Sequence, residues 1–556
     1  MPPAGRSAPD PPLASAAAGA PPSRWVNVAL EGKPRDEILR VASSYRLTVD
    51  VDVAQHVEAI ATAGFAEQSL FPEGTDEVAI TVQLDSTDFK VEEPQPTLHV
   101  PRSGASPDKA SFKITPLHDG ASTLTATLHK DGNFLQNIVV TFTVGGDRPV
   151  PVETTARGRP PSAAGVLQPR DVGVSLSPAA GGYDCIVWGE VAARARLPLQ
   201  PAYLAAAINA LRSELMKVVM HQDANGDYVF QAGIDIRDSD RDFALTTMAR
   251  AGALLFQKIF FGPAAGPDAK SVGNYLREAA SDGTRALKLQ VVAETAPIPW
   301  GLLYTGDAAA GAKLDWDLFI GMRHVVEEIP LQTTLAISDS AIASEPRLAV
   351  SVNVNTGIDA QLGVTVVADQ QTWWSTAATK RQRIGVTARA TRAEVVSALA
   401  NVATADQLLY FFCHAESAGL SDLGGPDASA LVLSDAKLTL GDLALDAPTS
   451  TALAGKPLVF INACESAELS PAFYDGFVPY FMAKGARGVI GTQCKTPALF
   501  AAEWAERFFD RFLGGEALGD AFLGLRREFL EQHGNPLGLL YAVHCDGDTR
   551  IEPAFA

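Results

Sequence analysis

The stretch LVFINACES, residues 458–466, decides the fold, because a short apolar run passes directly into polar residues. Leu458 to Ile461 follow Pro457, and such a run is typical of a central strand in a parallel sheet covered on both faces. The polar residues that follow would lie at the carboxyl end of this strand, where sites form in open α/β sheets. A cysteine with only a packing role would be expected within the run, so Cys464 is a candidate functional residue.

The composition limits the class of protein. The chain has 556 residues, 47% of them apolar, and a formal net charge of -19, which is consistent with about two to four globular domains. An acidic chain is poorly suited to a phosphate backbone, so no direct nucleic-acid partner is predicted. The five cysteines are widely spaced and form no CxxC pair, which indicates reduced thiols in a cytoplasmic protein. No apolar run approaches the roughly 18 residues of a membrane span, so no membrane contact is predicted.

The first third of the chain divides into three segments. Residues 1–23 are rich in proline and alanine and are predicted to be a disordered tail. Residues 24–147 contain short alternating apolar runs separated by turn residues, which predicts an antiparallel β-sandwich. Residues 148–182 are rich in proline, glycine and serine and are interpreted as a linker.

From residue 183 onward, predicted strands alternate with predicted helices. This order favours an α/β fold with a doubly wound, mostly parallel sheet. Residues 183–345 are expected to form one half, in which no strand ends in a matched histidine and cysteine. Residues 346–556 are expected to form the other half, which contains the strand that leads to Cys464.

A second strand also ends in a chemically active side chain. The run QLLYFFC, residues 407–413, is followed directly by His414, 50 residues before Cys464. If the two strands are parallel neighbours, an imidazole and a thiol meet at one edge of the sheet. The imidazole can then take the thiol proton and give a nucleophilic thiolate. Cys413 faces the opposite side of its strand and is interpreted as a small buried side chain. Cys494 is the main rival nucleophile.

These segments resemble the CHAT family of caspase-like cysteine peptidases, in the clan of caspases, metacaspases and separases. The resemblance is carried by YFFCHAES (410–417), LVFINACESAELSP (458–471) and PIPWGLLYTG (297–306), and it covers about residues 185–556. It implies a caspase-hemoglobinase fold. Residues 24–147 more loosely resemble a β-sandwich found ahead of CHAT domains in some bacterial proteins.

The resemblance assigns roles to the residues that match the motif. It implies that His414 is the general base, that Cys464 is the nucleophile, and that the backbone N–H groups of Cys464 and Ala415 hold the oxyanion. Caspase-type enzymes usually carry glycine directly after the histidine, and this chain has Ala415 there.

The residues around His414 and Cys464 indicate which substrate side chain the site would prefer. Asn462 replaces an aspartate found in several relatives with basic specificity, and a neutral amide cannot pair with a buried basic side chain. An uncharged substrate residue is therefore expected. The weaker candidates for substrate binding are Asn462, Glu416, Glu465 and Cys494, with solvated loop carboxylates as the alternative for the two glutamates.

The resulting hypothesis is a regulated cysteine endopeptidase that cleaves a specific protein substrate. The family implies bacterial defence or regulated cell death as the setting, and the β-sandwich is the expected contact for a protein activator or regulator. The dyad chemistry needs no cofactor and no metal. Two alternatives stay open, namely a catalytically inactive scaffold and a redox sensor that uses Cys464.

Overall fold

A computed structural model of the chain describes residues 24–555, apart from 66–70, 72–73, 93–95, 147–153, 159–166, 180, 190–191, 282–284, 294–297, 332–339, 417–424 and 464–470. The predicted tail and two of the predicted site residues, Cys464 and Glu465, lie outside the described residues. No helix in the described part of the chain is both long enough and apolar enough to cross a membrane.

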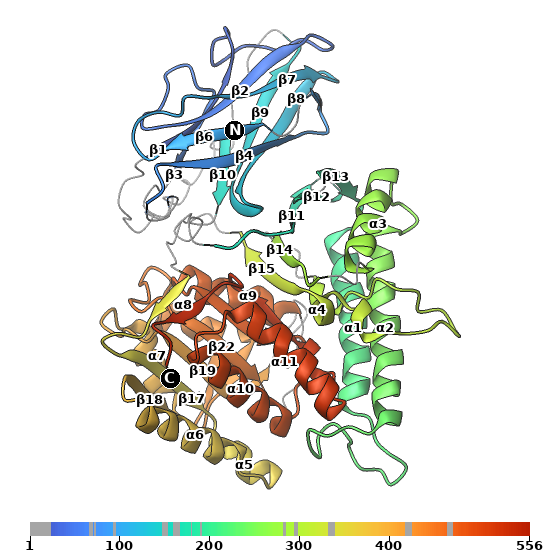
Figure 1. Ribbon diagram of the computed structural model, residues 1–556, viewed down its shortest axis with the longest axis vertical. Coiled ribbons are helices and arrows are strands. Elements are labelled where there is room, and N and C mark those ends of the chain that lie inside the picture. Colours follow the sequence, from blue (N-terminus) through green and yellow to red (C-terminus); the bar gives the residue numbers. More distant parts are fainter. Residues whose placement is uncertain are drawn as a thin grey trace, which may run out of the picture.

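Two five-stranded antiparallel sheets form the N-terminal part, drawn in blue in Figure 1. Their strand orders are β3-β1-β2-β7-β5 and β10-β9-β8-β4-β6. Side chains from both sheets share one apolar core, in which Val28, Val49 and Ile80 are fully buried. The strands are β1 (Arg24–Leu30), β2 (Tyr45–Asp52), β3 (Ala61–Phe65), β4 (Glu77–Asp85), β5 (Phe89–Glu92), β6 (Thr97–Pro101), β7 (Ala110–Pro116), β8 (Gly120–Lys130), β9 (Asn133–Val144) and β10 (Thr154–Gly158).

The segment interpreted as a linker contributes to both of its neighbours. β10 extends the second sheet of the sandwich by pairing with β9. β11 (Val172–Ala179) pairs with β12 (Gly182–Gly189) and with β14 (Lys288–Ala293) in the next sheet. The prediction of a linker over 148–182 is therefore wrong for residues 154–158 and 172–179, which form strands. In the second of these, Val172, Val174 and Leu176 alternate with small residues within a composition that is otherwise typical of a loop.

A five-stranded sheet of order β13-β12-β11-β14-β15 follows and is called the first sheet here. One of its faces packs against the helices α1, α2 and α3, which are green in Figure 1. β14 is parallel to both of its neighbours, and the β11-β12-β13 pairings are antiparallel. The remaining elements are β13 (Ala193–Leu197), α1 (Pro201–Val219), α2 (Asp238–Phe260), α3 (Pro267–Ser281), α4 (Ile320–Arg323) and β15 (Val325–Pro330).

The other face of the first sheet packs against the sandwich. Phe134 of β9 shares a small apolar cluster with Trp188 and Val292 of the first sheet. The Trp188 Nε1 donates to the Gly132 carbonyl at 2.7 Å, and the Phe134 N–H donates to the Gln290 Oε1 at 2.7 Å. The sandwich is therefore joined to the first sheet by both apolar and hydrogen-bonded contacts.

A buried ion network strengthens this junction. Arg170 donates to Glu327 of β15 and to Asp548 near the C-terminus, each at 2.7 Å, and all three side chains are buried. Glu327 also accepts from Gln290. Three distant segments of the chain are held at this one point.

The second sheet has the order β18-β17-β19-β22-β23-β24, and its pairings are parallel except for β24. The edge strand next to β23 is β24 (Tyr541–His544). The other strands here are β16 (Ala341–Ala343), β17 (Leu348–Val354), β18 (Ile384–Arg389), β19 (Leu408–Glu416), β20 (Ala430–Val432), β21 (Lys437–Thr439), β22 (Leu458–Ala463), β23 (Gly488–Thr492) and β25 (Arg550–Glu552). The short strands pair as β16 with β25 and as β20 with β21.

Helices cover both faces of the second sheet. α6, α10 and α11 share an apolar cluster with Tyr410 and Phe460, whereas α7, α8 and α9 share another with Phe411 and Ile461. The alternation of adjacent strand residues between two apolar clusters explains the continuous apolar runs of β19 and β22. The helices are α5 (Gly357–Leu362), α6 (Val366–Lys380), α7 (Arg392–Ala400), α8 (Leu440–Asp446), α9 (Pro471–Ala483), α10 (Ala498–Leu513) and α11 (Leu518–His533).

Candidate catalytic edge of the parallel sheet

The strands β19 and β22 are parallel neighbours in the centre of the second sheet (Figure 1). Their register runs from the pair Leu408 and Leu458 to the pair Cys413 and Ala463. The next residues along the two strands are His414 and Cys464. The prediction that the two strands are adjacent and parallel is confirmed, and Cys464 itself lies outside the described residues.

His414 is held firmly at this end of β19. Its side chain is buried, and its Nε2 lies 3.1 Å from the Oε1 of Gln361 in α5. An amide oxygen can only accept a hydrogen bond, so this contact favours the tautomer with the proton on Nε2. The lone pair is then on Nδ1, which makes Nδ1 the basic atom of the ring.

The residues on either side of His414 have different surroundings. Cys413 is fully buried in the apolar cluster beneath α7 to α9, and this burial raises the pKa of its thiol to about 12. Ala415 is also fully buried, in a stretch of β19 that pairs with β20. Glu416 is half-exposed and lies 2.5 Å from the Nζ of Lys437. Its carboxylate is therefore already paired with a lysine.

Asn462 is a structural residue of the core. Its Nδ2 donates to the Ala501 carbonyl at 2.7 Å and to the Tyr410 hydroxyl at 3.3 Å, and its Oδ1 accepts from the Tyr541 hydroxyl at 2.7 Å. The side chain is fully buried. The structure therefore corrects the expectation of substrate contact by Asn462, because its amide is used to join β19, β24 and α10.

Cys494 is also inaccessible. It follows β23, but only 1% of the residue is exposed, and its Sγ donates to the Lys495 carbonyl at 3.6 Å. Burial raises the pKa of this thiol to about 12, although the nearby Arg212 opposes the shift. Cys494 is therefore neither a ready nucleophile nor, in this structure, part of an open substrate pocket.

Arg212 is a residue at this edge that sequence reasoning missed. It belongs to α1 of the first half, and its Nη2 donates to the Oε1 of Gln493, directly after β23, at 2.8 Å. The guanidinium is almost fully buried. Nothing in the run ALRSELMK distinguishes this arginine from one on the exposed face of a helix.

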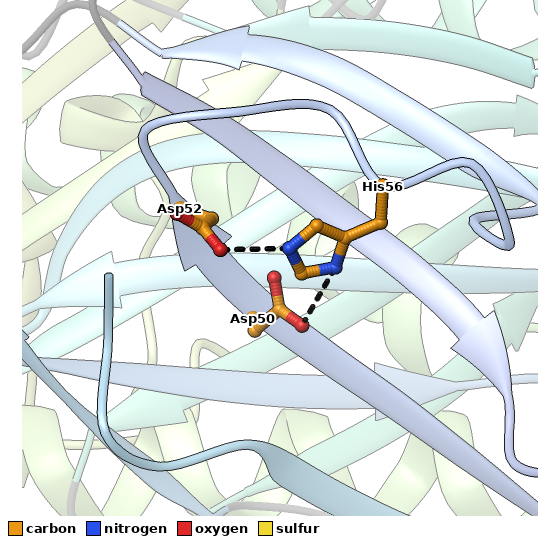
Figure 2. A group of neighbouring side chains, drawn as sticks. All are labelled: Asp50, Asp52 and His56. Carbon is orange, nitrogen blue, oxygen red and sulfur yellow. Dashed lines mark hydrogen bonds and ion pairs between the residues drawn. The ribbon is translucent and has the colours of Figure 1, made fainter. Parts of the chain in front are cut away.

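A separate group of titratable side chains lies in the sandwich (Figure 2). The Nε2 of His56 is 2.7 Å from Asp52, and its Nδ1 is 3.5 Å from Asp50. These three residues offer ligand atoms within 4.8 Å of one another. Lys109 and Asn27 also contact Asp50, at 3.2 Å and 3.0 Å. The two carboxylates therefore already face a lysine and an imidazole, so the group is internally paired. The sequence reading did not bring these residues together.

Asp52 shows how this pairing works. Burial of its carboxylate favours the neutral form, but hydrogen bonds from His56 and from the Val53 N–H outweigh that effect and lower its pKa. The carboxylate is therefore stabilised in its charged form.

Comparison with known proteins relates just under half of the chain to a known domain family. The model of the CHAT domain family matches residues 270–536, which include both β19 and β22. These residues are similar to a CHAT domain. His414 and Cys464 both fall inside the matched CHAT residues, whereas the sandwich lies before them.

Individual proteins resemble the chain only in part. A protein of Vitiosangium sp. (strain GDMCC 1.1324) named as a probable protease is 36% identical over 140 residues, which are 24% of this chain and 17% of that protein. The Saccharomyces cerevisiae separase, solved in a complex with securin, is similar at 9% identity and a TM-score of 0.39 over 67% of this chain and 30% of that chain. The CARDB domain of a Pyrococcus furiosus protein, solved with di-metal ions, gives a TM-score of 0.14 at 13% identity over 24% of this chain and 95% of that chain.

Proposed function

We propose that this chain is a cysteine endopeptidase in which His414 is the general base and Cys464 is the nucleophile. The observation that carries the proposal is the parallel register of β19 and β22, whose last pair is followed by these two residues. The CHAT family and the protease name of the Vitiosangium relative support the same reading.

The chemistry follows from the two side chains. His414 accepts the thiol proton, and the Cys464 thiolate attacks the carbonyl carbon of a substrate peptide bond. The oxyanion is held by backbone N–H groups, for which Cys464 and Ala415 are the candidates. The imidazolium then protonates the leaving amine, and water hydrolyses the thioester to release the acid and restore the thiol.

The substrate is proposed to be a specific protein with an uncharged residue before the cleaved bond. Asn462 carries no charge, and its amide is hydrogen-bonded within the core, so this side chain cannot form an ion pair with a basic substrate residue. Glu465 and Glu416 stay candidates for contact with the substrate backbone. A cytoplasmic role in bacterial defence or regulated cell death, with an activator that binds the sandwich, completes the proposal.

A thiol-reactive peptide probe tests the dyad directly. Wild-type protein is expected to be labelled, Cys464→Ala to be unlabelled, and His414→Ala to be labelled at least about 100-fold more slowly, because the base has been removed. Cys494→Ala is the matched control, since this thiol is buried, and it should be labelled like wild type. Labelling that survives in Cys464→Ala would contradict the proposed nucleophile. No labelling of wild type by any probe, with or without candidate activators, would favour the inactive scaffold.

A further inference from the structure

A cavity of about 330 Å³ lies away from the catalytic edge, between the segment before β14, the short helix α4 and the long helix α11. Three arginines line it, one from each of these places. The full lining is Arg285, Ala286, Asp317, Met322, Arg323, Arg527, Leu530 and Glu531. We call it the arginine pocket. The three guanidinium groups exceed the two carboxylates of the lining, those of Asp317 and Glu531, by one charge.

Arg527 is fixed in position without being neutralised. Its Nε donates to the Met322 carbonyl at 3.2 Å, and its Nη2 donates to the Arg323 carbonyl at 3.0 Å. Among the described residues, no carboxylate lies within ion-pair distance of this guanidinium. Backbone carbonyls fix the side chain but do not cancel its charge, so a positive charge is held in place beside the cavity.

The other two arginines have carboxylate partners that differ in how firmly they are held. Arg285 donates to Asp171 at 2.6 Å, and the second oxygen of Asp171 accepts from the Lys288 N–H. Arg323 pairs with Asp317 at 3.0 Å, but the Asp317 side chain is 55% exposed. An exposed pair of this kind contributes at most about 1 kcal/mol, so a ligand can displace Asp317 at little cost.

We propose that the arginine pocket binds the phosphate group of a small phosphorylated molecule. The guanidinium fork matches two phosphate oxygens, and Arg527 and Arg323 would provide this contact when Asp317 moves away. Leu530, which is partly exposed, and Ala286, which is exposed, offer apolar surface for the organic part of the ligand. The volume is near the lower end of the range for small-molecule sites, which favours a ligand of mononucleotide size.

The position of the pocket gives the ligand a structural consequence. Arg323 is at the end of α4 in the first half of the chain, and Arg527 is in α11, which packs on the second sheet. A phosphate bound by both arginines would add a contact between the two halves. Binding should therefore raise the melting temperature of the whole chain as well as release heat.

Calorimetric titration of the full chain with inorganic phosphate, adenosine monophosphate and adenosine tests this proposal. Adenosine monophosphate should bind, phosphate should bind more weakly, and adenosine should not bind. Arg527→Gln should weaken binding at least about 10-fold, because a charge-assisted contact is lost. Asp317→Asn should tighten it several-fold, because the competing carboxylate is removed. The matched control is Arg250→Gln, an exposed arginine of α2 outside this pocket, which should bind like wild type.

Arg527→Gln should weaken ligand binding and Asp317→Asn should tighten it, and these opposite changes in affinity distinguish a ligand site from a structural role. If Arg527→Gln does not fold, as judged by its melting curve, the Asp317→Asn arm still decides the question. Absence of binding by all three probes would overturn the proposal, as would equal weakening in Arg250→Gln. Binding of a phosphopeptide or an oligonucleotide in place of adenosine monophosphate would assign the arginine pocket to a macromolecule and also overturn it.

Discussion

The two sheets of the region that follows the sandwich use their buried polar residues in different ways. In the first sheet, Gln290 and Glu327 bind the sandwich hairpin and Arg170, so the polar groups join domains. In the second sheet, Asn462 fixes neighbouring elements within the core, and His414 stands at a strand end. Helices cover both faces of the second sheet, whereas the sandwich replaces helices on one face of the first. This difference is consistent with the proposal that the second sheet carries the chemistry, with the first sheet as its platform.

The platform role of the first sheet is tested most severely at Arg170. The substitution Arg170→Met leaves the carboxylates of Glu327 and Asp548 buried without the cation that they share. Breaking a buried ion network in this way lowers the unfolding free energy by about 3 to 5 kcal/mol. Urea unfolding should show this loss. The control is Arg46→Met, whose pair with Glu31 is well exposed and should be worth less than about 1 kcal/mol. A loss equal to that of the control would remove the distinction between the two sheets.

In the second sheet, Asn462→Ala should lower both stability and activity. The substitution leaves the hydroxyls of Tyr410 and Tyr541 and the Ala501 carbonyl with fewer partners, which predicts a loss of about 2 to 4 kcal/mol in unfolding free energy. Because Asn462 is two residues before Cys464, labelling of Cys464 by the peptide probe should slow as well. Unchanged unfolding together with slower labelling would instead assign Asn462 to substrate binding.

Much of this second sheet could be predicted from the sequence. The apolar runs of β19 and β22 are buried on both faces, and that requirement leaves a strong pattern in adjacent residues. The parallel order followed from the helices between the strands, and the register then brings His414 next to the end of β22. Local patterns were sufficient here because each strand is short and continuous in sequence.

Other side-chain contacts and strands depend on residues far apart in the sequence, and no local sequence pattern indicates them. Asn462 was read as a substrate residue, but its partners are 39 to 79 positions away. Arg212 reaches Gln493 across 281 positions. The strands β10 and β11 were hidden within a proline- and glycine-rich composition that is typical of a linker. Side-chain partners of this kind become visible only when the fold is assembled.

The seam between the two sheets provides a pH test. Burial raises the pKa of Glu328 in β15 to about 8, and burial lowers the pKa of the neighbouring His544 in β24 to about 4. Their contact at 3.5 Å therefore joins two uncharged groups at neutral pH rather than an ion pair. The folded chain holds the Glu328 proton more tightly than the unfolded chain does, so this group lowers stability progressively as the pH rises from its unfolded pKa toward 8.

Glu328→Gln should remove that penalty. Relative to wild type, the variant should gain little at pH 5 and about 2 to 4 kcal/mol at pH 8 and above, measured as the difference in unfolding free energy across the pH range. Val325→Ala in the same strand is a control for packing loss, and its effect should not change with pH. A gain that is constant from pH 5 to pH 9 would show that Glu328 does not titrate in this range.

The smallest expected effect concerns a helix that belongs to the second sheet alone. Thr391 caps α7, because its side chain accepts from the Glu394 N–H while Glu394 accepts from the Thr391 N–H. Thr391→Ala should cost about 1 kcal/mol, the usual value for a lost N-cap. Thr391→Ser keeps the hydroxyl and should recover most of that loss.

Because α7 packs on the second sheet and makes no part of the first sheet's core, the loss should not loosen the sandwich junction. Limited proteolysis between the sandwich and the first sheet should therefore be unchanged in Thr391→Ala and faster in Arg170→Met. Faster cleavage in both variants would mean that the two sheets unfold as one unit, and the division into a platform and a catalytic sheet would then fail.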